Sequence, residues 1–536
     1  MPSWGDEVDV VVLGSGAAAL AAALTTVANG ASVAVYEKAA TVGGTTAVSG
    51  GVVWIPAHNR SPDGELTVED ALSYLRAQSF GSMDDALVDT FVRSGPAMLD
   101  FIEAHSSLRF EIATGFPDYK PELPGGQPGG GRSLTAAPFD LKYLGGWRDR
   151  ITAFPQDWSN VGFDAETRAR LHAGADENAD LCVAGTALIA GLLKGLLDAG
   201  VTPQTDARAE ELIAEDGKIV GVRIACGGGQ LDVHARDGVI MGTGGFEWAP
   251  GLVNAFLRGP MHGAVSPPNN TGDGLRMMMA HGADLANMGE AWWVPIVQIP
   301  GDTIDGKPRS RSVRLERTRP RSIIINRAGR RFVNEACDYN SMAGAFHYLD
   351  PRDGYINDPA WIVFDSQHLK RYGFLGVDPG GSVPDWFCES ANLSELAAKT
   401  GIALDGLNRT IDAWNHNVGA GSDPDFGRGS SAYDGYWGDD HATTPAGKTL
   451  GPVDTGPFYA VPVSVGAMGT KGGPRTDRDG RVLHVSGAPI PGLFAAGNAM
   501  GGVTGRAYGG AGGTIGPAMV FGYRAGYAAA TGKSVD

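Results

Sequence analysis

The sequence predicts an α/β fold with a Rossmann-like domain at its N-terminus, and three adjacent features support this prediction. The stretch VDVVVLG at 8–14 is rich in β-branched residues and indicates a buried strand. It is followed by AALAAALTTVANG at 18–30, which indicates a helix that ends at a glycine. A second strand, ASVAVYEK at 31–38, completes a strand, helix and strand in the order that such a domain requires.

The turn between the first strand and the helix carries the pattern GxGxxA, in the stretch GSGAAA at 14–19. Gly14 makes the tight turn, Gly16 lets a pyrophosphate approach the backbone, and Ala19 lets the helix pack closely. Glu37 ends the second strand, where an acid binds the ribose hydroxyls of a dinucleotide. The alternative is a glycine turn in an ordinary βαβ unit, but strand, helix and acid together favour dinucleotide binding.

The same region has a rival interpretation as a membrane helix, because no residue from Val10 to Tyr36 carries a charge. Gly14 and Gly16 interrupt this apolar run, which disfavours a membrane span. A signal peptide is also disfavoured, because the residues just before the run are acidic rather than basic. We therefore expect no integral membrane segment.

Composition excludes several kinds of partner and site. With 536 residues the chain is long enough for two or three domains that enclose cofactor and substrate sites. A net charge of −17 and the lack of a Lys/Arg cluster argue against nucleic acid and anionic membrane surfaces as partners. The four cysteines are far apart and form no CxxC pair, so we expect free thiols, no metal site and a cytoplasmic protein.

Three more glycine-rich segments follow: TVGGTTAVSGG at 41–51, GVIMGTGGFEW at 238–248 and IPGLFAAGNAMGG at 490–502. This set resembles the flavoproteins of the fumarate reductase and 3-ketosteroid dehydrogenase superfamily. The resemblance implies that the N-terminal pattern binds the pyrophosphate of FAD and that the AAGN segment returns to the flavin end. The loop at 41–51 contains no histidine or cysteine that could bond to flavin, so FAD is expected to bind noncovalently.

The resemblance and the fingerprint together predict a set of cofactor-binding positions. They are Gly14, Gly16, Ala18, Ala19, Glu37, Lys38, Gly43, Gly44, Thr45, Thr46, Ser49, Gly50, Gly51, Arg208, Gly242, Thr243, Gly244, Gly497, Asn498, Gly513, Thr514 and Ile515. Many relatives in the wider two-dinucleotide-fold class have an acid where this chain has Asn498.

The same resemblance implies a split Rossmann-like FAD-binding domain with an inserted α+β catalytic domain. The FAD-binding parts are expected at 1–285 and 465–536, and the inserted domain at 286–464, packed over the flavin. Two consecutive helices are predicted in the insert, from NLSELAAKTG at 392–401 and LDGLNRTIDAWNHNV at 404–418, with Asn392 or Ser394 as the first cap.

Five further segments narrow the resemblance. They are GFPDYKPELPGG at 115–126, AWWVP at 291–295, GRRFVNEACDY at 329–339, DPDFGRGSSAYDGYWGD at 423–439 and GTKGGPRTD at 469–477. Together they span nearly the whole chain and resemble the 3-ketosteroid Δ1-dehydrogenase family and its relatives that desaturate cyclic ketones. The FVNE and DFGRG stretches are shared across the superfamily and specify fold more than substrate.

The resemblance also implies which residues form the active site. In that family the catalytic groups are a tyrosine in PDYxPE, a tyrosine shortly after FVNE, and a tyrosine and a glycine amide in the final glycine-rich segment. Here these groups fall on Tyr119, Tyr339, Tyr508 and Gly512. The family usually has Pro-Tyr after FVNE, whereas this chain has Asp338-Tyr339 followed by Asn340.

The implied chemistry is the desaturation of a ketone next to its carbonyl group. The Tyr508 hydroxyl and the Gly512 N–H would stabilise the ketone oxygen as negative charge develops on it. Tyr339 would take the α proton, assisted by a hydrogen bond from Tyr119, and flavin N5 would take a hydride from the β carbon. A separate electron acceptor would then reoxidise the flavin.

Several substrates and functions stay open. The proline-rich tyrosine segment and AWWVP resemble the steroid branch more closely, so the resemblance favours 1,2-dehydrogenation of a 3-ketosteroid over a single-ring ketone such as cyclohexanone or an oxocyclohexane carboxylate. A Δ4-type ketosteroid dehydrogenase and a flavin-binding protein without turnover are further alternatives. A fumarate reductase is disfavoured, because Ala507 and Tyr508 stand where those relatives have Arg-Leu, although Arg506 lies nearby.

Overall fold

The N-terminal strand, helix and strand form as the sequence predicts. They are β1 (Asp6–Leu13), α1 (Ala17–Ala28) and β2 (Val33–Tyr36), and the two strands pair in parallel. The computed structural model describes residues 4–61, 64–153 and 180–535. Among these residues, no helix combines the length and the apolar character needed to cross a membrane. All four cysteines are free thiols.

The main sheet joins segments from both ends of the chain. Its strands follow the order β2-β1-β10-β22-β21, with β10 (Gly229–Met241), β22 (Pro489–Ala495) and β21 (Arg481–Leu483). Strand β10 is parallel to both β1 and β22. Its first half pairs antiparallel with β9 (Lys218–Cys226), which pairs with β8 (Arg208–Glu215). The parallel arrangement brings the carboxyl ends of β1, β2, β10 and β22 to one edge.

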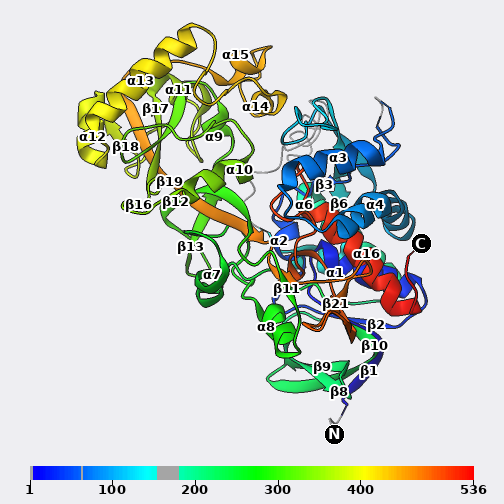
Figure 1. The fold of residues 1–536 in the computed structure, drawn as a ribbon. Helices are drawn as coiled ribbons and strands as arrows, with labels where there is room; N and C mark the ends of the chain where they lie inside the picture. Colours follow the sequence, from blue (N-terminus) through cyan, green and yellow to red (C-terminus); the bar gives the residue numbers. More distant parts are fainter. Residues whose placement is uncertain (1–3, 62–63, 154–179, 536) are drawn as a thin grey trace.

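Helices cover this sheet, and both chain ends lie in the same lobe (Figure 1). The last helix, α16 (Ile515–Thr531), lies directly against α1. A Cβ on Gly522 or Gly526 would lie 2.3 or 2.4 Å from the backbone oxygens of Ala18 and Ala22. The two helices can therefore approach this closely only because these positions lack side chains. Two further helices, α4 (Asp85–His105) and α6 (Ala184–Asp198), also contact α1.

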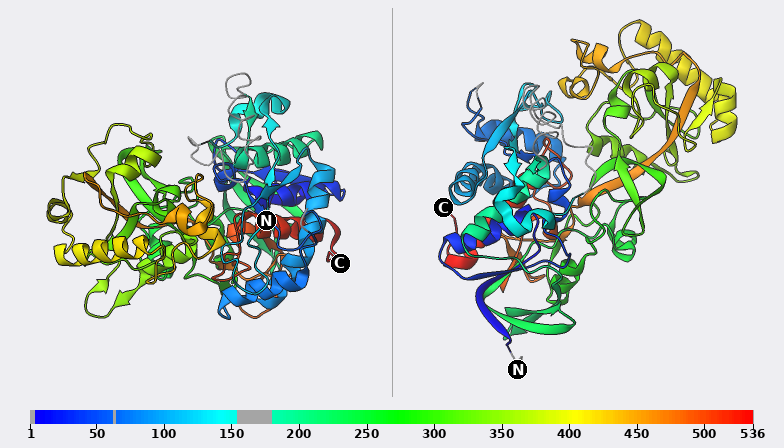
Figure 2. Two further views of the ribbon diagram at one scale, coloured as in Figure 1. Left: turned by 90° about the horizontal axis from the view of Figure 1, so that it is seen from above. Right: turned by 180° about the vertical axis from the view of Figure 1, so that it is seen from behind.

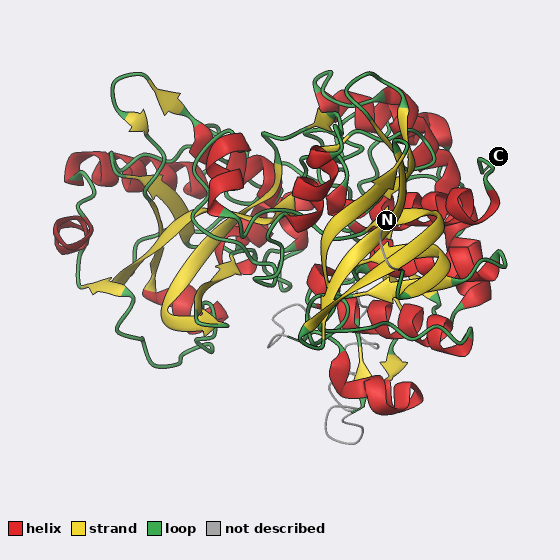
Figure 3. Ribbon diagram, turned by 90° about the horizontal axis from the view of Figure 1, so that it is seen from below, coloured by secondary structure: helices red, strands yellow, loops and turns green. Residues whose placement is uncertain are grey.

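A second lobe contains a six-stranded antiparallel sheet, seen apart from the first sheet in Figure 3. Its strands are β12 (Ala291–Ile304), β13 (Lys307–Ser312), β14 (Ser322–Asn326), β17 (Ala360–Asp365), β18 (Cys388–Ser390) and β19 (Phe458–Thr470). Strand β19 pairs with β12, β17 and β18. It runs through residue 464, where the sequence places the end of the inserted domain.

The two predicted helices of the insert are α12 (Leu393–Thr400) and α13 (Leu404–Gly419), which pack on one face of this sheet. The side chain of Asn392, rather than that of Ser394, caps α12 by accepting a hydrogen bond from the N–H of Glu395 at 3.0 Å. The opposite face packs against α10 (Tyr339–Gly344). Figure 2 shows from two sides how this lobe stands beside the first.

A small three-stranded sheet completes the first lobe. It is formed by β3 (Val53–Trp54), β5 (Gly130–Ala136) and β4 (Phe110–Thr114).

The remaining elements of the described residues are α2 (Gly44–Ala47), α3 (Val68–Ser79), α7 (Pro250–Phe256), α8 (Asp273–Ala280), α9 (Leu315–Thr318), α11 (Ser366–Tyr372), α14 (Ala432–Tyr436), α15 (Pro445–Thr449), β6 (Phe139–Asp140), β7 (Leu181–Cys182), β11 (Leu285–Ala286), β15 (Leu349–Asp350), β16 (Gly354–Tyr355), β20 (Gly473–Pro474), and the 3₁₀ helices η1 (Leu141–Arg150), η2 (Ala345–His347) and η3 (Gly497–Ala499).

Candidate active site

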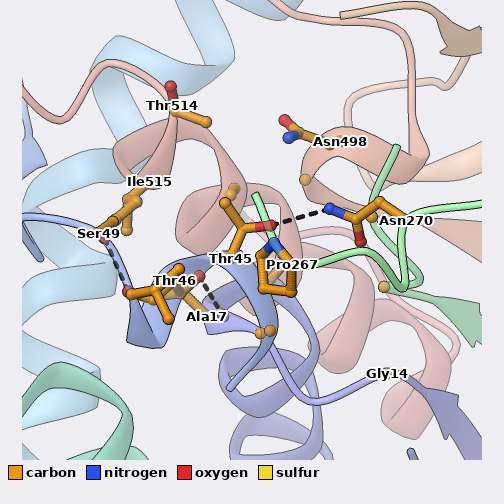
Figure 4. A pocket seen from close by; sticks show the side chains of 18 of the residues that line it. Gly14, Ala17, Thr45, Thr46, Ser49, Pro267, Asn270, Asn498, Thr514 and Ile515 are labelled. Atoms are coloured by element: carbon orange, nitrogen blue, oxygen red, sulfur yellow. Dashed lines mark hydrogen bonds between the residues drawn. The ribbon is translucent and has the colours of Figure 1, made fainter. Parts of the chain in front are cut away.

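A long pocket begins at the carboxyl edge of the main sheet and reaches the second lobe. Its first part is lined by the turn after β1, the loop at 41–51 and the end of β10. Its second part is lined by Tyr119, Tyr508 and the start of α16 together with residues of the second lobe. Figure 4 shows side chains from these different segments turned toward one cavity.

The turn after β1 leaves room for an anion beside the N-terminus of α1. Gly14 has a φ of +103°, and a Cβ on it would lie 2.4 Å from the backbone oxygen of Gly242. Only glycine can therefore occupy this position. Gly16 precedes the first turn of α1, where backbone N–H groups and the helix dipole favour a phosphate group.

Glu37 lies in the pocket at the end of β2. Its buried carboxylate accepts hydrogen bonds from the Ser15 hydroxyl at 2.6 Å and from the Ala39 N–H at 2.8 Å. Burial raises the pKa of Glu37, and these two hydrogen bonds lower it. The next residue, Lys38, is held by Thr271 at 2.8 Å and by Asp273 at 3.1 Å.

The loop at 41–51 is attached to its surroundings through its hydroxyl groups, as Figure 4 shows. The Thr46 hydroxyl accepts the Ala17 N–H at 3.2 Å, and the Ser49 hydroxyl donates to the Thr46 carbonyl at 2.7 Å. The Asn270 amide donates to the Thr45 hydroxyl at 2.9 Å. Asn270 also lines the pocket, yet no sequence pattern points to it, because it lies 225 residues away from Thr45.

Most of the predicted cofactor positions line this pocket. They are Gly14, Gly16, Ala18, Glu37, Lys38, Gly44, Thr45, Thr46, Ser49, Gly50, Gly51, Arg208, Gly242, Thr243, Gly244, Gly497, Asn498, Thr514 and Ile515. Three predicted positions stand behind its wall instead. Ala19 packs on Gly242, the Gly43 N–H donates to the Ser15 hydroxyl at 2.9 Å, and Gly513 packs against the Tyr508 ring.

Three tyrosine hydroxyls meet at the far end of the pocket. The Tyr119 hydroxyl donates to that of Tyr339 at 2.6 Å, and Tyr339 donates to Tyr508 at 2.9 Å. The Thr514 hydroxyl donates to Tyr508 at 3.2 Å. All three tyrosines are buried, and burial raises the pKa of each phenol. The structure thus brings together three residues that are up to 389 positions apart in the chain (119 to 508).

Tyr119 is positioned by the loop that follows β4. Its N–H donates to the carbonyl of Gly509 at 3.0 Å, which ties the loop to the glycine-rich segment of Tyr508. The preceding residue, Asp118, is fully buried and accepts hydrogen bonds from Trp54 at 3.0 Å and Arg132 at 2.6 Å. A buried ion pair therefore holds this loop in place.

The glycines around Tyr508 allow its segment to lie flat on a tryptophan. A Cβ on Gly509 or Gly510 would lie 2.4 or 2.5 Å from the Trp54 ring. Gly512 has a φ of +92°, and a Cβ there would lie 2.4 Å from the Val52 oxygen. Gly512 also lines the pocket beside Tyr508.

The unusual residues on both sides of Tyr339 have structural roles. Asp338 caps α10, because its carboxylate accepts the Ser341 N–H at 2.8 Å. The Asn340 side chain accepts the Trp293 N–H at 3.2 Å. Both contacts fix the first turn of α10, and with it the direction of the Tyr339 side chain.

This chain is similar to known proteins over nearly its whole length. Residues 9–515 match the FAD binding domain family. The 4-oxocyclohexanecarboxylate 2-dehydrogenase of Sinomonas cyclohexanicum is 42% identical over 97% of this chain and 92% of its own length. The 3-oxosteroid 1-dehydrogenase of Mycolicibacterium smegmatis is 39% identical over 97% of both chains.

A solved structure extends the similarity to the whole fold. The crystal structure of 3-ketosteroid Δ1-dehydrogenase from Sterolibacterium denitrificans has a TM-score of 0.89 and 33% identity, over 98% of this chain and 100% of the other. This chain belongs to the 3-ketosteroid Δ1-dehydrogenase family of FAD-dependent flavoproteins. The family resemblance stated from the sequence is confirmed, and so is FAD as the cofactor.

The pocket of this family member suits FAD. The Gly14 turn and the start of α1 leave space and N–H donors for a pyrophosphate, and the Glu37 carboxylate faces the same cavity. At the other end Asn498 accepts a hydrogen bond from the Trp292 indole at 3.0 Å, and it too lines the pocket. Asn498 therefore contributes an amide, rather than a carboxylate, to this end of the pocket.

Aromatic rings enclose the substrate end of this flavoprotein. Phe116 stacks on Tyr436 with 4.2 Å between ring centroids, and Trp437 meets Phe116 edge-on at 5.5 Å. Trp292 meets Tyr508 edge-on at 4.7 Å. Trp437 also lines the pocket.

A buried lysine lies behind Tyr508. Lys471 donates to the carbonyl oxygens of Gly505 and Ala507 at 3.1 and 3.0 Å. Its Nζ lies 4.1 Å from the centre of the Trp292 ring and 5.8 Å from that of Tyr508. Burial lowers the pKa of Lys471 to about 7. The GTKGG stretch contains this residue, but the sequence does not show that it contacts the tyrosine segment.

Arg506 is directed away from the pocket. Its side chain is 61% exposed and its Nε pairs with Glu290 at 3.0 Å. Arg506 is absent from the described residues that line the pocket. The site therefore does not use it as a clamp for a dicarboxylate such as fumarate.

The FVNE and DFGRG stretches meet in a buried ionic cluster away from the tyrosines. Arg331 pairs with Glu335 at 2.7 Å and with Asp423 at 2.8 Å, and Arg428 pairs with Glu335 at 3.2 Å. Burial raises the pKa of Glu335, but the positive charges of the two arginines lower it by more. The pKa of Glu335 therefore lies below its usual value. These ion pairs connect separate segments of the second lobe.

Proposed function

We propose that this protein desaturates a cyclic ketone by removing a proton from the α carbon and a hydride from the β carbon. The observation that carries this proposal is the contact between the Tyr119, Tyr339 and Tyr508 hydroxyls at the end of an FAD pocket. The product is an α,β-unsaturated ketone. Bound FAD supplies the acceptor for the hydride, and a separate electron acceptor is needed for turnover.

Tyr508 and Gly512 are assigned to the ketone oxygen. When the α C–H bond breaks, negative charge develops on that oxygen, and donors already directed at it stabilise the charge. The Tyr508 hydroxyl and the Gly512 N–H come from one segment, which is held rigidly against Trp54. The Thr514 hydroxyl donates to Tyr508 and so leaves the Tyr508 proton available for the ketone.

Tyr339 is assigned to the α proton. Burial raises the pKa of Tyr339 well above 10, and the hydrogen bond from Tyr119 lowers it. A phenolate oxygen on Tyr339 would therefore be stabilised by the Tyr119 hydroxyl at 2.6 Å. The α proton passes to this oxygen. The Tyr119 hydroxyl stabilises the negative charge on Tyr339 and does not itself take the α proton.

Two substrate classes fit this reaction. The sequence favours a 3-ketosteroid, and relatives at 37% to 39% identity are named 3-oxosteroid 1-dehydrogenases. A relative at 42% identity is named for 4-oxocyclohexanecarboxylate, which is a single-ring ketone with a carboxylate. Both have hydrogens on the α and β carbons next to a ring ketone.

The reaction can be tested by mixing the flavin-loaded protein with ketones under anaerobic conditions and following the flavin absorbance. A cyclic ketone should bleach the flavin without added nicotinamide, whereas an alcohol or succinate should leave it oxidised. Tyr339→Phe should bleach at least about 10²-fold more slowly while keeping its flavin. If no ring ketone bleached the wild-type flavin, ketone desaturation would be rejected.

A further inference from the structure

The buried Lys471 lies directly behind the wall of the pocket. It lines a small cavity together with Gly497, Asn498, Thr514 and Ala518, and these four residues also line the main pocket. One side of this wall therefore faces the lysine, and the other side faces the space for cofactor and substrate. Lys471 is almost completely buried, so water does not screen its charge from the pocket.

The side chain of Lys471 holds the backbone that leads to Tyr508. Its Nζ donates to the carbonyl oxygens of Gly505 at 3.1 Å, Arg506 at 3.3 Å and Ala507 at 3.0 Å. An ammonium group has three N–H donors and no acceptor, so these carbonyls use its full donor capacity. The charged form of the lysine therefore fits the residues just before Tyr508.

The same nitrogen lies beside the Tyr508 ring. It is 4.1 Å from the centre of the Trp292 ring and 5.8 Å from the centre of the Tyr508 ring, within the range of cation–π attraction. Trp292 in turn meets Tyr508 edge-on at 4.7 Å. At the far end of that ring, the Tyr508 hydroxyl contacts the Tyr339 hydroxyl at 2.9 Å. A positive charge thus lies beside the ring whose hydroxyl belongs to the tyrosine cluster.

The charge of Lys471 is not neutralised by direct pairing in the part of the chain that the structure describes, because its side-chain acceptors there are uncharged carbonyls. The Glu290 carboxylate, in contrast, pairs with Arg258 at 3.2 Å and with Arg506 at 3.0 Å. Burying a cation without a contacting anion costs free energy in the resting protein. That cost falls when negative charge forms nearby.

Four ionisable groups act on Lys471 from the surrounding elements. Burial has the largest effect and lowers the pKa of the lysine to about 7. The negative charges of Glu290 and Asp338 raise this pKa, and the positive charges of Arg258 and Lys120 lower it. The charge of Lys471 can therefore be changed within the pH range in which enzymes are assayed.

The proposed reaction produces negative charge close to this cation. As the α C–H bond breaks, the charge develops on the ketone oxygen, to which the Tyr508 hydroxyl is assigned. A fixed positive charge beside the tyrosine ring favours electron density on the ring side of the O–H bond, so the hydroxyl becomes a stronger donor. In a buried site such an interaction is much stronger than in water.

We propose that Lys471 is a positioning residue of the oxyanion site: its ammonium group holds the backbone before Tyr508, and its positive charge strengthens the hydrogen bond from Tyr508 to the ketone oxygen. This inference rests on the proposed function. Lys471 acts through Tyr508, without contacting the substrate, and keeps its proton during the reaction. The α proton goes to Tyr339, and the hydride goes to FAD.

The first test compares wild type with Lys471→Met, which keeps the length of the side chain but loses its charge. Anaerobic bleaching of bound flavin is followed with the most reactive of three ring ketones: cyclohexanone, 4-oxocyclohexane-1-carboxylate and androst-4-ene-3,17-dione. At pH 6 wild type should bleach roughly 10- to 100-fold faster than Lys471→Met, as expected for the loss of a charge beside a developing oxyanion.

The pH dependence of this ratio separates charge from packing. Lys471 is charged below its pKa of about 7 and loses its proton as the pH rises, so the ratio should fall between pH 6 and pH 9. Ionisations of the tyrosines and of the ketone occur in both proteins and cancel in the ratio. A ratio that stayed constant over this range would show that the charge has no role and would overturn the inference.

A second test asks whether Lys471 acts through Tyr508. In a Tyr508→Phe background, Lys471→Met should slow bleaching less than about threefold further, because the hydroxyl that the charge affects is absent. An equal effect of Lys471→Met with and without the Tyr508 hydroxyl would assign the lysine to another group, and the inference would be wrong.

Three controls complete the experiment. Lys218→Met removes an exposed lysine that also donates to a backbone carbonyl, that of Arg236 at 2.8 Å, and it should bleach like wild type. Flavin content reports whether Lys471→Met is folded. Lys471→Gln is a second neutral variant that keeps N–H donors, and it should also lose the pH-dependent advantage of wild type. Bleaching of wild type by none of the three ketones would reject the proposed function itself.

Discussion

At the residue scale, the three tyrosines differ in what holds them. Tyr508 lies in a glycine-rich segment packed on Trp54, Tyr339 is the first residue of α10, and Tyr119 lies in a loop fixed by the buried Asp118. Their hydroxyls nevertheless meet within 2.6 to 2.9 Å. Because these backbones are held by contacts other than the phenol hydroxyls, replacing one phenol by phenylalanine should leave the other two in place.

Tyr508→Phe should slow the chemical step by roughly 10² to 10³, which is the usual effect of losing one donor to a developing oxyanion. Tyr339→Phe should be at least as damaging, because it removes the group that takes the proton, and Tyr119→Phe should be milder. Anaerobic bleaching rates at saturating ketone measure these effects, with flavin content as the control. Near wild-type bleaching by Tyr339→Phe would show that another group takes the proton.

Glu37→Ala should weaken FAD binding roughly 10- to 100-fold, because one or two hydrogen bonds to a charged carboxylate are lost. Glu37→Gln keeps an acceptor for the Ser15 hydroxyl, so its loss should be smaller. Titration of the flavin-free proteins with FAD gives the three dissociation constants. An unchanged constant for Glu37→Ala would remove Glu37 from the cofactor site.

At the element scale, close backbone packing decides where the catalytic groups lie. The segment 508–513 runs between β3 and the start of α16, and Trp54 fills the space that side chains at 509 and 510 would need. The Gly509 carbonyl also accepts hydrogen bonds from the Tyr74 hydroxyl at 2.6 Å and from the Tyr119 N–H at 3.0 Å. Movement of this segment would therefore disturb two of the three tyrosines together.

Gly509→Ala should destabilise the protein by about 1 to 3 kcal/mol, since its Cβ would lie 2.4 Å from the Trp54 ring and force the core to shift. Ketone bleaching should fall as well, because Tyr508 and Tyr119 would move. Gly251→Ala is a matched control in α7, where a Cβ meets nothing within 4 Å, and it should be neutral or slightly stabilising. Urea unfolding of both variants measures the difference. Equal stability of the two variants would argue against the Trp54 contact as the constraint.

At the scale of the whole molecule, the site depends on how the two lobes meet. Lys471 follows β19 of the second lobe, and it donates to carbonyl oxygens at 505–507 in the segment that carries Tyr508. It is buried, with a side chain that spans the junction beside Trp292. A buried ionisable group thus lies at the junction between the substrate lobe and the cofactor lobe.

The stability of the protein should depend on pH through Lys471. Its folded pKa is about 7, whereas an unfolded lysine has a pKa of about 10.4. Between these values the unfolded chain binds the proton and the folded protein does not, so stability rises with pH, by at most about 1.4 kcal/mol per pH unit. Below pH 7 both states are charged and this contribution no longer changes.

Lys471→Met serves as the reference, because it removes this group and leaves the others. The difference in the free energy of unfolding between wild type and Lys471→Met should increase in favour of wild type from pH 7 to pH 9. Urea titrations at three pH values measure it. A difference that stays constant over this range would mean that Lys471 keeps an ordinary pKa.

The sequence predicted the local parts of this fold well, for a physical reason. β1, α1 and β2, and the pair α12 and α13, are defined by short-range patterns of apolar residues, glycines and caps. The resemblance to known flavoproteins supplied the cofactor and the family, and the comparisons confirmed both. The individual FAD-binding positions stay a prediction. The assignment of Tyr119, Tyr339, Tyr508 and Gly512 to catalytic roles stays a prediction.

The sequence by itself therefore determined the fold class and, through short motifs that resemble a known family, the cofactor and the kind of chemistry, because each motif consists of residues that are neighbours in the chain. Only the tertiary structure decided which distant groups share one environment: Asn270 beside Thr45, Trp54 beneath the tyrosine segment, and Lys471 behind it. Burial and proximity set the charge, packing and pKa of such groups. Both arise when segments hundreds of residues apart come together, and no local pattern records them.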